Sequence, residues 1–310
     1  MGLPLRVGTR GSALALAQAG TVAALLGSDV ELVTVTTSGD RASAASPAAP
    51  SSVNDKERWV KELELALLAG EIDLAIHSAK DVPSVLPDGL ELVGAPARGN
   101  PYDALVGAGS LASLPAGARV GTASLRRAAQ LLALREDLEV VVVRGNVDTR
   151  LRRLAEGEAD ALVLAAAGLQ RLDRGEQIGC LLDGLVPAPG QGTLVLEARA
   201  GDVRAAAAAR TISDRATWDA LLAERACVAL LDASCNTPLG VHAQVGVGDG
   251  GGAAAIVMRT FAGLPDGSAW LRDETPPCAT PAEAGALAAE RLLAAGGREL
   301  LARAEEVAAP

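Results

Sequence analysis

The sequence is poor in aromatic residues and in residues that commonly bind metals. Its 310 residues include one Tyr, one Phe, three Trp, two His and four Cys. The cysteines, which are Cys180, Cys227, Cys235 and Cys278, form no Cys-x-x-Cys pair and no cluster with histidine. Zinc sites are normally built from such groups, so we expect no metal site. Reduced thiols in a cytoplasmic protein are the default interpretation of these cysteines.

Long apolar runs and positive net charge are also absent. No apolar run reaches the length of about 18 residues that a membrane-spanning helix needs. The N-terminal stretch MGLPLRVGTRGS has neither the basic segment nor the apolar core of a secretory signal. The net charge of −10 argues against binding to nucleic acids or anionic membranes. We therefore expect a cytoplasmic protein without nucleic-acid or membrane partners.

Short strand-like runs alternate with helical patterns over most of the first 200 residues. The run LRVGT precedes SALALAQAGTVAALL, for example, and IDLAIHS follows the helical pattern VKELELALLAG. This alternation is typical of α/β domains whose parallel sheets carry helices on both faces. The remaining segments, two strands around a glycine-rich turn between helices, predict a small α+β domain. A chain of this length exceeds one comfortable core, so two or three domains are expected.

Three segments interrupt the alternation of strands and helices. The strand pattern breaks between Gly94 and Pro101, which predicts a first domain boundary. Residues 185–199 are rich in proline and glycine and then strand-like, as expected of a segment that crosses between domains. Residues 42–55 are small, polar and proline-bearing, which is typical of a mobile loop.

The stretch AIHSAKDVPS, residues 75–84, places polar and ionisable groups at the end of an apolar strand. His77, Ser78, Lys80 and Asp81 all come before Pro83, which ends any regular structure. A solvated loop is the ordinary interpretation of a Lys-Asp pair. In a parallel α/β sheet, however, ligands collect where the strand ends meet at one edge. The alternative is therefore that Lys80 and Asp81 belong to a ligand site.

Arginines recur where three strands lead into helices. The segments VGTRGSALAL, VGTASLRRAAQ and VVRGNVDTRLRRL each combine a capping residue with arginine in or beside the first helical turn. These arginines are Arg10, Arg126, Arg127, Arg144 and Arg150. The positive end of a helix dipole disfavours cations, so the repeated pattern predicts a compensating anion. Because the guanidinium group binds carboxylates bidentately, a carboxylate ligand is favoured.

Two other interpretations of these arginines stay open at this point. Each arginine taken alone is compatible with an ordinary surface salt bridge. A phosphate ligand would also suit the N-termini of helices. Against phosphate, the stretches GTRGS and RGNVDT match neither the Walker motif nor the dinucleotide-binding fingerprint.

Eight segments in a fixed order carry a resemblance to a known family. They are VGTRGSALALAQ, KELELALLAGEIDLAIHSAKDVPS, RGNPYDALV, VGTASLRRAAQL, VVRGNVDTRLRRL, DALVLAAAGLQRL, PAPGQGTLVLEAR and ASCNTPLG. Over nearly its whole length the chain resembles hydroxymethylbilane synthases, also called porphobilinogen deaminases. The resemblance implies a cytoplasmic, monomeric transferase of porphyrin and haem biosynthesis. Such an enzyme joins four molecules of its substrate porphobilinogen head to tail, releases four ammonia and frees a linear tetrapyrrole.

The resemblance also implies an architecture. The fold would be α/β, with two doubly wound domains like the lobes of bivalve periplasmic binding proteins and a small α+β third domain. Domain 1 would comprise residues 1–96 and 193–212, domain 2 residues 97–192, and domain 3 residues 213–310. The loop at residues 42–56 would be a flexible lid over the site.

The resemblance assigns roles to individual residues. Asp81 would be the catalytic carboxylate, which stabilises the cation formed when porphobilinogen loses ammonia. Cys235 would carry a dipyrromethane cofactor through a thioether, whereas a buried, inert thiol is the ordinary interpretation of such a cysteine. The residues implied to bind substrate and cofactor are Arg10, Ser12, Lys56, His77, Ser78, Lys80, Ser124, Arg126, Arg127, Arg144, Arg150, Arg171 and Gln191.

Two functions of other classes remain as alternatives. A two-domain binding protein that captures a small organic anion would need the arginines, but neither Asp81 nor a modified Cys235. An effector-sensing regulator would need a DNA-binding helix-turn-helix, which we do not recognise in the sequence, and the acidic net charge disfavours it.

Overall fold

The computed structural model describes residues 3–36, 57–232, 237–248 and 252–308. The chain divides into two compact units, Met1–Gly99 with Gly192–Trp218 and Asn100–Gln191 with Asp219–Pro310. They are called unit 1 and unit 2 below, and each is described by itself. The three domain boundaries expected from the sequence stay a prediction.

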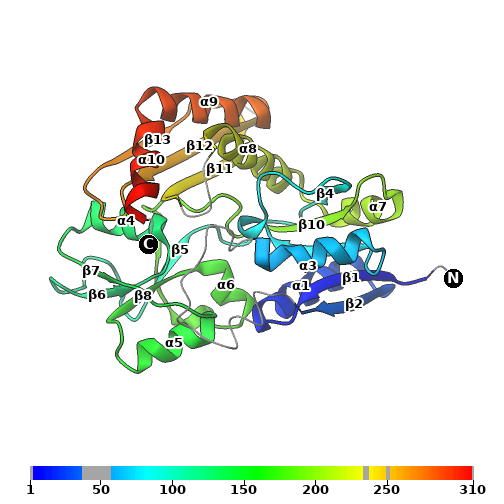
Figure 1. The fold of residues 1–310 in the computed structure, drawn as a ribbon, viewed down its shortest axis with the longest axis horizontal. Coiled ribbons are helices and arrows are strands. Elements are labelled where there is room, and N and C mark those ends of the chain that lie inside the picture. Colours follow the sequence, from blue (N-terminus) through cyan, green and yellow to red (C-terminus); the bar gives the residue numbers. More distant parts are fainter. Residues whose placement is uncertain (1–2, 37–56, 233–236, 249–251, 309–310) are drawn as a thin grey trace. The chain divides into compact units, whose positions relative to one another are not determined.

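Unit 1 is built on a five-stranded mixed sheet with the strand order β2-β1-β3-β10-β4 (Figure 1). Strands β1 to β3 run parallel, and β10 runs antiparallel to both of its neighbours, β3 and β4. The strands are β1 (Leu5–Arg10), β2 (Val30–Val35), β3 (Leu74–Ser78), β4 (Leu90–Gly94) and β10 (Leu194–Arg199). The helical segments are α1 (Ala13–Leu26), α3 (Glu57–Leu68), the short 3₁₀ helix η1 (Ala79–Asp81) and α7 (Val203–Ile212).

Helices cover both faces of this sheet. The side chains of Leu74 and Ile76 pack on one face with residues of α1 and α7. The alternate residue of β3, Ala75, faces the other side, where it packs with Leu63 and Leu67 of α3. Because the strand is buried on both faces, it appears in the sequence as a continuous apolar run rather than as an alternating one.

The first sheet of unit 2 repeats this plan with the order β7-β6-β8-β5-β9. The fourth strand, β5, again runs antiparallel to both neighbours, and α4 packs on one face while α5 and α6 pack on the other. The strands are β5 (Asp103–Val106), β6 (Arg119–Gly121), β7 (Glu139–Val141), β8 (Ala161–Ala165) and β9 (Ile178–Leu182). The helical segments are α4 (Leu125–Leu134), α5 (Val147–Ala155), α6 (Ala166–Arg171) and η2 (Gly175–Gln177).

A small third domain carries an antiparallel three-stranded sheet in the order β11-β12-β13. Its strands are β11 (Leu239–Gly248), β12 (Gly252–Gly263) and β13 (Trp270–Glu274), and its helices are α8 (Arg215–Leu231), α9 (Pro281–Ala294) and α10 (Gly297–Ala308). One core joins the helices to the sheet through small and aliphatic residues such as Ala223, Ala288 and Met258. The α+β character expected of this part of the chain is confirmed.

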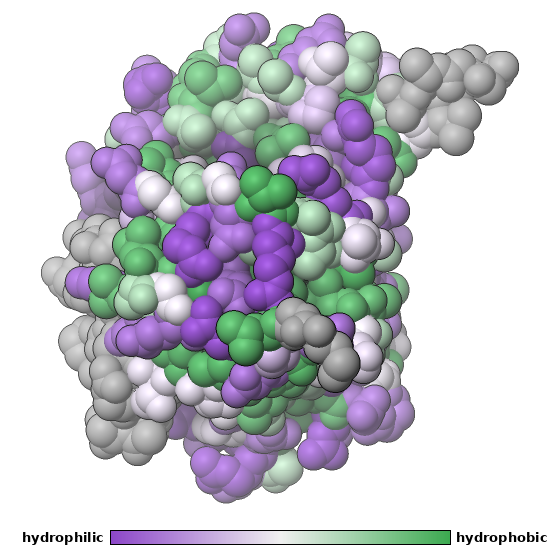
Figure 2. Space-filling model, turned by 90° about the vertical axis from the view of Figure 1, so that its right-hand side faces the viewer, coloured by the Kyte–Doolittle hydropathy of each residue, from purple (hydrophilic) through white to green (hydrophobic). Residues whose placement is uncertain are grey.

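The surface mixes polar and apolar residues. On the face shown in Figure 2, hydrophobic and hydrophilic residues are interspersed. The exposed large apolar side chains include Val85, Val203 and Leu3. Single exposed apolar residues of this kind are normal in folded proteins and mark no particular function.

Candidate active site

In unit 1, the predicted residues lie at one edge of the sheet. Strand β1 is flanked by β2 on one side and by β3 on the other, so the chain changes its winding direction between β1 and β3. Ligand sites of α/β sheets lie at such switch points, beyond the carboxyl ends of the strands. Arg10 ends β1 and Ser78 ends β3, and Lys80 and Asp81 follow in η1. The structure thus brings these four residues to the same edge.

Asp81 is held at this edge by backbone hydrogen bonds of its own segment. Ala79 N donates to Thr193 O at 3.0 Å, and Val82 N donates to Ala79 O at 3.3 Å. The Asp81 side chain is half-buried. Among the described residues, none donates a hydrogen bond to its carboxylate or forms an ion pair with it. A partly buried carboxylate without such a donor is suited to meet a cationic group of a ligand.

The capping residues expected at the three helix starts are confirmed. The hydroxyl of Ser12 accepts from Ala15 N at the start of α1, and that of Ser124 accepts from Arg127 N at the start of α4. Asn146 caps α5 by accepting from Thr149 N at 2.8 Å. A capping hydroxyl still carries a proton that it can donate. Ser12 and Ser124 can therefore stabilise a helix and donate to a ligand oxygen at the same time.

His77 already has a protein partner. Its Nε2 lies 2.9 Å from Oε2 of Glu197, and both side chains are buried. Glu197 belongs to β10, which pairs with β3 beside it. The predicted role of His77 in ligand binding stays a prediction, and the observed contact joins two neighbouring strands.

In unit 2, Arg126 and Arg127 share a carboxylate from the chain itself. Nη1 of Arg126 donates to Oδ2 of Asp103 at 2.8 Å, and Nε of Arg127 donates to Oδ1 at 2.9 Å. Both arginines are 5% exposed and Asp103 is completely buried. Burial alone would raise the pKa of the Asp103 carboxyl, but the charges of Arg126 and Arg127 bring that pKa well below its usual range. The sequence pattern predicted an anion at the start of this helix. For Arg126 and Arg127, the Asp103 carboxylate of the chain itself supplies a negative charge.

Asp103 was not anticipated from the sequence. It begins β5, which enters the sheet antiparallel from a segment upstream of α4, 23 residues before Arg126. Its first residue therefore lies at the same edge as the carboxyl end of β8, with which it pairs at Ala165. The only available signal was an acidic residue directly before the apolar run ALV.

Arg127, Arg144 and Arg150 form a cationic cluster at this edge. The Nε of Arg150 donates to Gly145 O at 2.8 Å. Burial, followed by the charges of Arg127 and Arg144, lowers the pKa of the Arg150 guanidinium to about 10. Among the described residues, no carboxylate pairs with Arg144 or Arg150. Crowded like charges of this kind are typical of sites that bind an anion.

Arg171 and Gln191 are placed differently. Arg171 ends α6, the helix that follows β8, and burial lowers the pKa of its guanidinium. Gln191 is buried, and its Nε2 donates to Oδ1 of Asp103 at 2.9 Å and to Pro101 O at 2.8 Å. Gln191 therefore contacts the carboxylate that holds the arginine pair, which sequence reasoning did not predict.

Three expectations fall on parts of the chain outside the described residues. These are Lys56, Cys235 and the loop at residues 42–56. Within the described ranges, no group of His, Cys, Asp and Glu side chains is arranged to hold a metal ion. The described helices likewise include none that is long and apolar enough to span a membrane.

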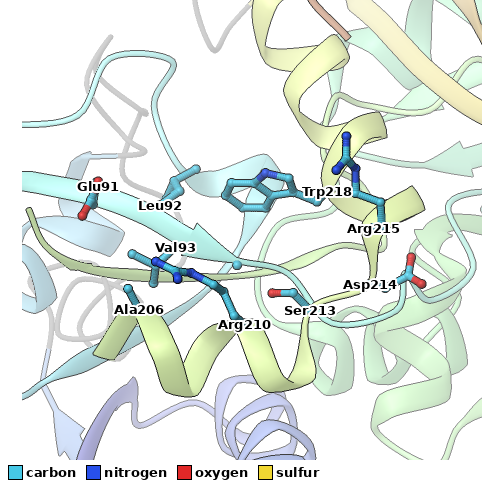
Figure 3. Close-up of a pocket in the computed structure, with 10 residues that line it drawn as sticks. Glu91, Leu92, Val93, Ala206, Arg210, Ser213, Asp214, Arg215 and Trp218 are labelled. Atoms are coloured by element: carbon cyan, nitrogen blue, oxygen red, sulfur yellow. The ribbon is translucent and has the colours of Figure 1, made fainter. Parts of the chain in front are cut away.

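A pocket of about 390 Å³ lies in unit 1, apart from the predicted residues (Figure 3). It is lined by β4, the end of α7 and the first turn of α8, with Trp218 beside Leu92 and Arg210 on the opposite wall. Two of its polar side chains are already engaged, because Ser213 accepts from Ala95 N and Asp214 accepts from Thr217 N. The pocket contains none of the predicted site residues.

Fold and site together define an α/β protein of two sheet-containing lobes and a small third domain, with a carboxylate at one sheet edge and an arginine cluster at another. Two family models match this chain. The model of the porphobilinogen deaminase dipyromethane cofactor binding domain matches residues 5–207, and that of the porphobilinogen deaminase C-terminal domain matches residues 218–294. The chain belongs to the porphobilinogen deaminase family, and the resemblance stated from its sequence is confirmed.

Similar proteins agree with this assignment. A porphobilinogen deaminase of Roseiflexus castenholzii is 46% identical over 311 residues, covering 96% of this chain and 98% of that protein. A porphobilinogen deaminase of Deinococcus radiodurans is 43% identical and covers 97% of this chain. Among solved structures, a periplasmic substrate-binding protein from Coxiella burnetii covers 69% of this chain at 14% identity with a TM-score of 0.41, which is too low to support an argument.

Proposed function

We propose that this chain condenses four porphobilinogen molecules head to tail into a linear tetrapyrrole and releases four ammonia. Membership of the porphobilinogen deaminase family supports this proposal. The observation that carries it is the cluster of Arg127, Arg144 and Arg150 at one sheet edge, where burial and the two like charges lower the pKa of Arg150. Porphobilinogen bears an acetate and a propionate on its pyrrole ring, so the substrate supplies the anions that Arg144 and Arg150 lack among the described residues.

The same cluster fits a dipyrromethane cofactor, whose two rings carry carboxylates of the same kind. We propose that Cys235 holds this cofactor through a thioether and that Arg127, Arg144, Arg150 and Arg171 bind its carboxylates together with those of the substrate. The bound cofactor supplies the nucleophilic pyrrole carbon from which the chain is extended. Ser124 has a hydroxyl proton at the start of α4 with which it can donate to one of these carboxylates.

Asp81 is proposed as the catalytic carboxylate. Cleavage of the carbon–nitrogen bond of porphobilinogen releases ammonia and leaves a cation delocalised over the pyrrole ring. A fixed carboxylate beside the pyrrole N–H stabilises that cation, and it can also accept the proton lost when the new carbon–carbon bond forms. Arg10, Ser12, Ser78 and Lys80, which share the sheet edge with Asp81, are proposed to hold the substrate carboxylates.

The remaining expectations complete the proposal. We expect Lys56, His77, Arg126 and Gln191 to contact ligand carboxylates. The three-domain division at residues 96, 192 and 212, the cytoplasmic location and the monomeric state are expectations of the same kind. They are supported by the resemblance of the segments quoted above.

Intact-protein mass spectrometry tests the proposed function. The purified protein is expected to be heavier than its sequence by one dipyrromethane, and to gain successive ring masses when porphobilinogen is added. The Cys235→Ser variant is the matched control, because it should show neither increment. A wild-type protein of unmodified mass that binds porphobilinogen without consuming it would instead identify a binding protein.

A further inference from the structure

Asp103 is the centre of a buried polar network in unit 2. Its Oδ1 accepts from Arg127 Nε at 2.9 Å, Gln191 Nε2 at 2.9 Å and Arg126 Nη2 at 3.2 Å, and Arg127 Nη2 forms an ion pair with the same oxygen at 2.8 Å. Its Oδ2 accepts from Arg126 Nη1 at 2.8 Å. A carboxylate with five such contacts and no solvent exposure leaves the arginine pair very little freedom.

These contacts decide which donors of Arg127 remain for a ligand. Its Nε donates to Asp103 Oδ1, its Nη2 lies 2.8 Å from the same oxygen, and its Nη1 donates to Val163 O at 3.0 Å. A guanidinium has five N–H donors in a rigid plane. N–H groups on Nη1 and Nη2 therefore remain, and their directions follow from the position of the Asp103 carboxylate. Arg127 is also one of the two residues whose charges act on Arg150 in the cationic cluster.

The same network ties the arginine pair to the segment at residues 186–191. Nη1 of Arg126 donates to Val186 O at 2.7 Å, and Gln191 is bonded to Asp103. This segment is held in turn by the third domain: Gly190 N donates to Glu224 of α8 at 2.6 Å, and Val241 N donates to Pro187 O at 2.9 Å. In the sequence, Cys235 lies between α8 and β11, the two elements that make these contacts.

We propose that Asp103 is a positioning residue for carboxylate binding: it sets the direction of the Arg127 guanidinium and fixes the arginine pair to the segment at residues 186–191. A ligand tethered to the third domain by a covalent bond needs its carboxylate partners at a fixed place relative to that tether. The inference rests on the proposed function, because it takes the ligand to be a pyrrole chain that bears carboxylates.

Two other roles for Asp103 predict a different effect of its removal on ligand affinity. If bulk charge governed ligand binding, removing the negative charge of Asp103 would strengthen it, because the arginine cluster would gain one net positive charge. If Asp103 were merely structural, its loss would lower thermal stability and leave the affinity of the folded protein unchanged. Positioning predicts weaker binding although the site becomes more positive.

Two substitutions separate these roles. In Asp103→Asn, the amide oxygen can replace Oδ1 and keep its three donors and its contact with Arg127 Nη2, and the amide nitrogen then faces Arg126 Nη1. Asp103→Ala removes every contact but changes the net charge by the same amount. Asp160→Asn is the control, because it removes an exposed ion pair with Arg119 in the same lobe.

The measurements are the steady-state KM and kcat for porphobilinogen, the fraction of purified protein that carries the dipyrromethane mass, and the melting temperature. We expect KM to rise about threefold in Asp103→Asn and about thirtyfold in Asp103→Ala, as the loss of one or several charge-assisted hydrogen bonds would give. The kcat should change less than KM, and the cofactor-loaded fraction should fall in the same order. Asp160→Asn should match wild type in KM and in loading.

Equal or lowered KM values in the two variants would overturn the proposal, whatever happens to the melting temperature. If Asp103→Ala fails to fold, Asp103→Asn decides alone: a raised KM supports positioning, and an unchanged or lowered KM refutes it. The proposed function fails separately, because a wild-type protein without the dipyrromethane mass and without turnover refutes that function irrespective of Asp103.

Discussion

Two candidate site residues, Asp81 and Arg150, carry charges that the described surroundings leave uncompensated. Asp81 receives no hydrogen bond from a described residue, and the side chain of Arg150, which lies beside two other arginines, has a backbone carbonyl as its hydrogen-bond partner within the described ranges. Neither arrangement favours the stability of the folded chain. Natural proteins keep such residues where function requires them. Substitutions at these positions should therefore lower activity without lowering the stability of the fold.

Asp81→Asn is expected to separate turnover from folding. The amide has nearly the shape of the carboxylate but cannot stabilise a cation or accept a proton, so kcat should fall by about 10²–10³. Melting temperature and cofactor loading should stay at wild-type values. Asp88→Asn is the control, because Asp88 is an exposed residue of the same loop region and should retain full activity. Near-normal turnover of Asp81→Asn would remove Asp81 from the mechanism.

Arg150→Met should weaken ligand binding without lowering stability. The substitution removes a guanidinium that burial and two like charges disfavour, so the melting temperature should be unchanged or raised. Loading with dipyrromethane should drop, and KM for porphobilinogen should rise by about tenfold or more.

Arg152→Met on the same helix is the matched control for Arg150→Met. Arg152 is exposed and pairs with Glu156 at 2.9 Å in an i,i+4 arrangement. Such pairs contribute only about 0.3–0.5 kcal/mol, so neither loading nor KM should change. A marked loss of stability in Arg150→Met with normal loading would show that Arg150 is structural.

The arginine pair shows what residue patterns can and cannot predict. The sequence pattern at Arg126 and Arg127 predicted a compensating anion at the helix start and favoured a carboxylate ligand. The structure shows a carboxylate of the chain itself there, because Asp103 lies against both guanidinium groups. No local pattern reveals this partner, since it depends on how a strand 23 residues upstream enters the sheet.

At the scale of elements, the two large sheets share one plan. In each, three parallel strands are followed by an antiparallel strand and then by a parallel edge strand. The antiparallel strand comes from a distant segment in both cases, β10 in one sheet and β5 in the other. The alternation of strands and helices, the caps and the crossing segment at residues 185–199 were predictable, because each has a local signature. No local signature in the sequence shows where β5 enters the sheet. The strand β13 was likewise not identified from the sequence.

In each large sheet, a glycine of the strand between two parallel neighbours is closely packed by side chains. Gly121 in β6 and Gly8 in β1 belong to the two Val-Gly-Thr sequences, and a Cβ atom on Gly121 would lie 2.5 Å from Leu162 Cδ2 and 2.7 Å from Val143 Cγ2. Gly121→Ala is therefore expected to lower the free energy of unfolding by about 1–3 kcal/mol through overpacking. Urea unfolding measures this change.

Gly20→Ala provides the opposite case for comparison with Gly121→Ala. Gly20 lies in the middle of α1 and is exposed, and a Cβ atom there would meet nothing within 4 Å. Alanine should raise the free energy of unfolding by about 0.5–1 kcal/mol, because it loses less backbone entropy in a helix. Equal effects of the two substitutions would contradict the close-packing account of Gly121.

At the scale of the whole molecule, the chain is acidic, yet several of its arginine side chains gather at one edge of a sheet. The net charge is −10, yet the strand ends of the first sheet of unit 2 gather Arg126, Arg127, Arg144 and Arg150. Composition disfavours general polyanion binding, but it could not reveal this concentration, because net charge averages over the surface. The fold class and the edge position of the site followed from strand–helix alternation, whereas the partners of each charge required the structure.

The buried Asp103 carboxylate should contribute to the acid sensitivity of the molecule. Although burial opposes it, the charges of Arg126 and Arg127 lower its pKa in the folded state. The unfolded chain therefore takes up the proton first as pH falls through the usual aspartate range near 3.8. The stability that the ionised Asp103 contributes is fully present above about pH 5 and is lost progressively below it.

Between pH 5 and pH 3, the wild-type protein should lose about 1 kcal/mol more free energy of unfolding than Asp103→Asn, which has no such proton to bind. Urea unfolding of both proteins at the two pH values measures the difference. Identical losses in wild type and Asp103→Asn would mean that Asp103 is not held ionised by the arginine pair, and the positioning role built on that pair would fall with it.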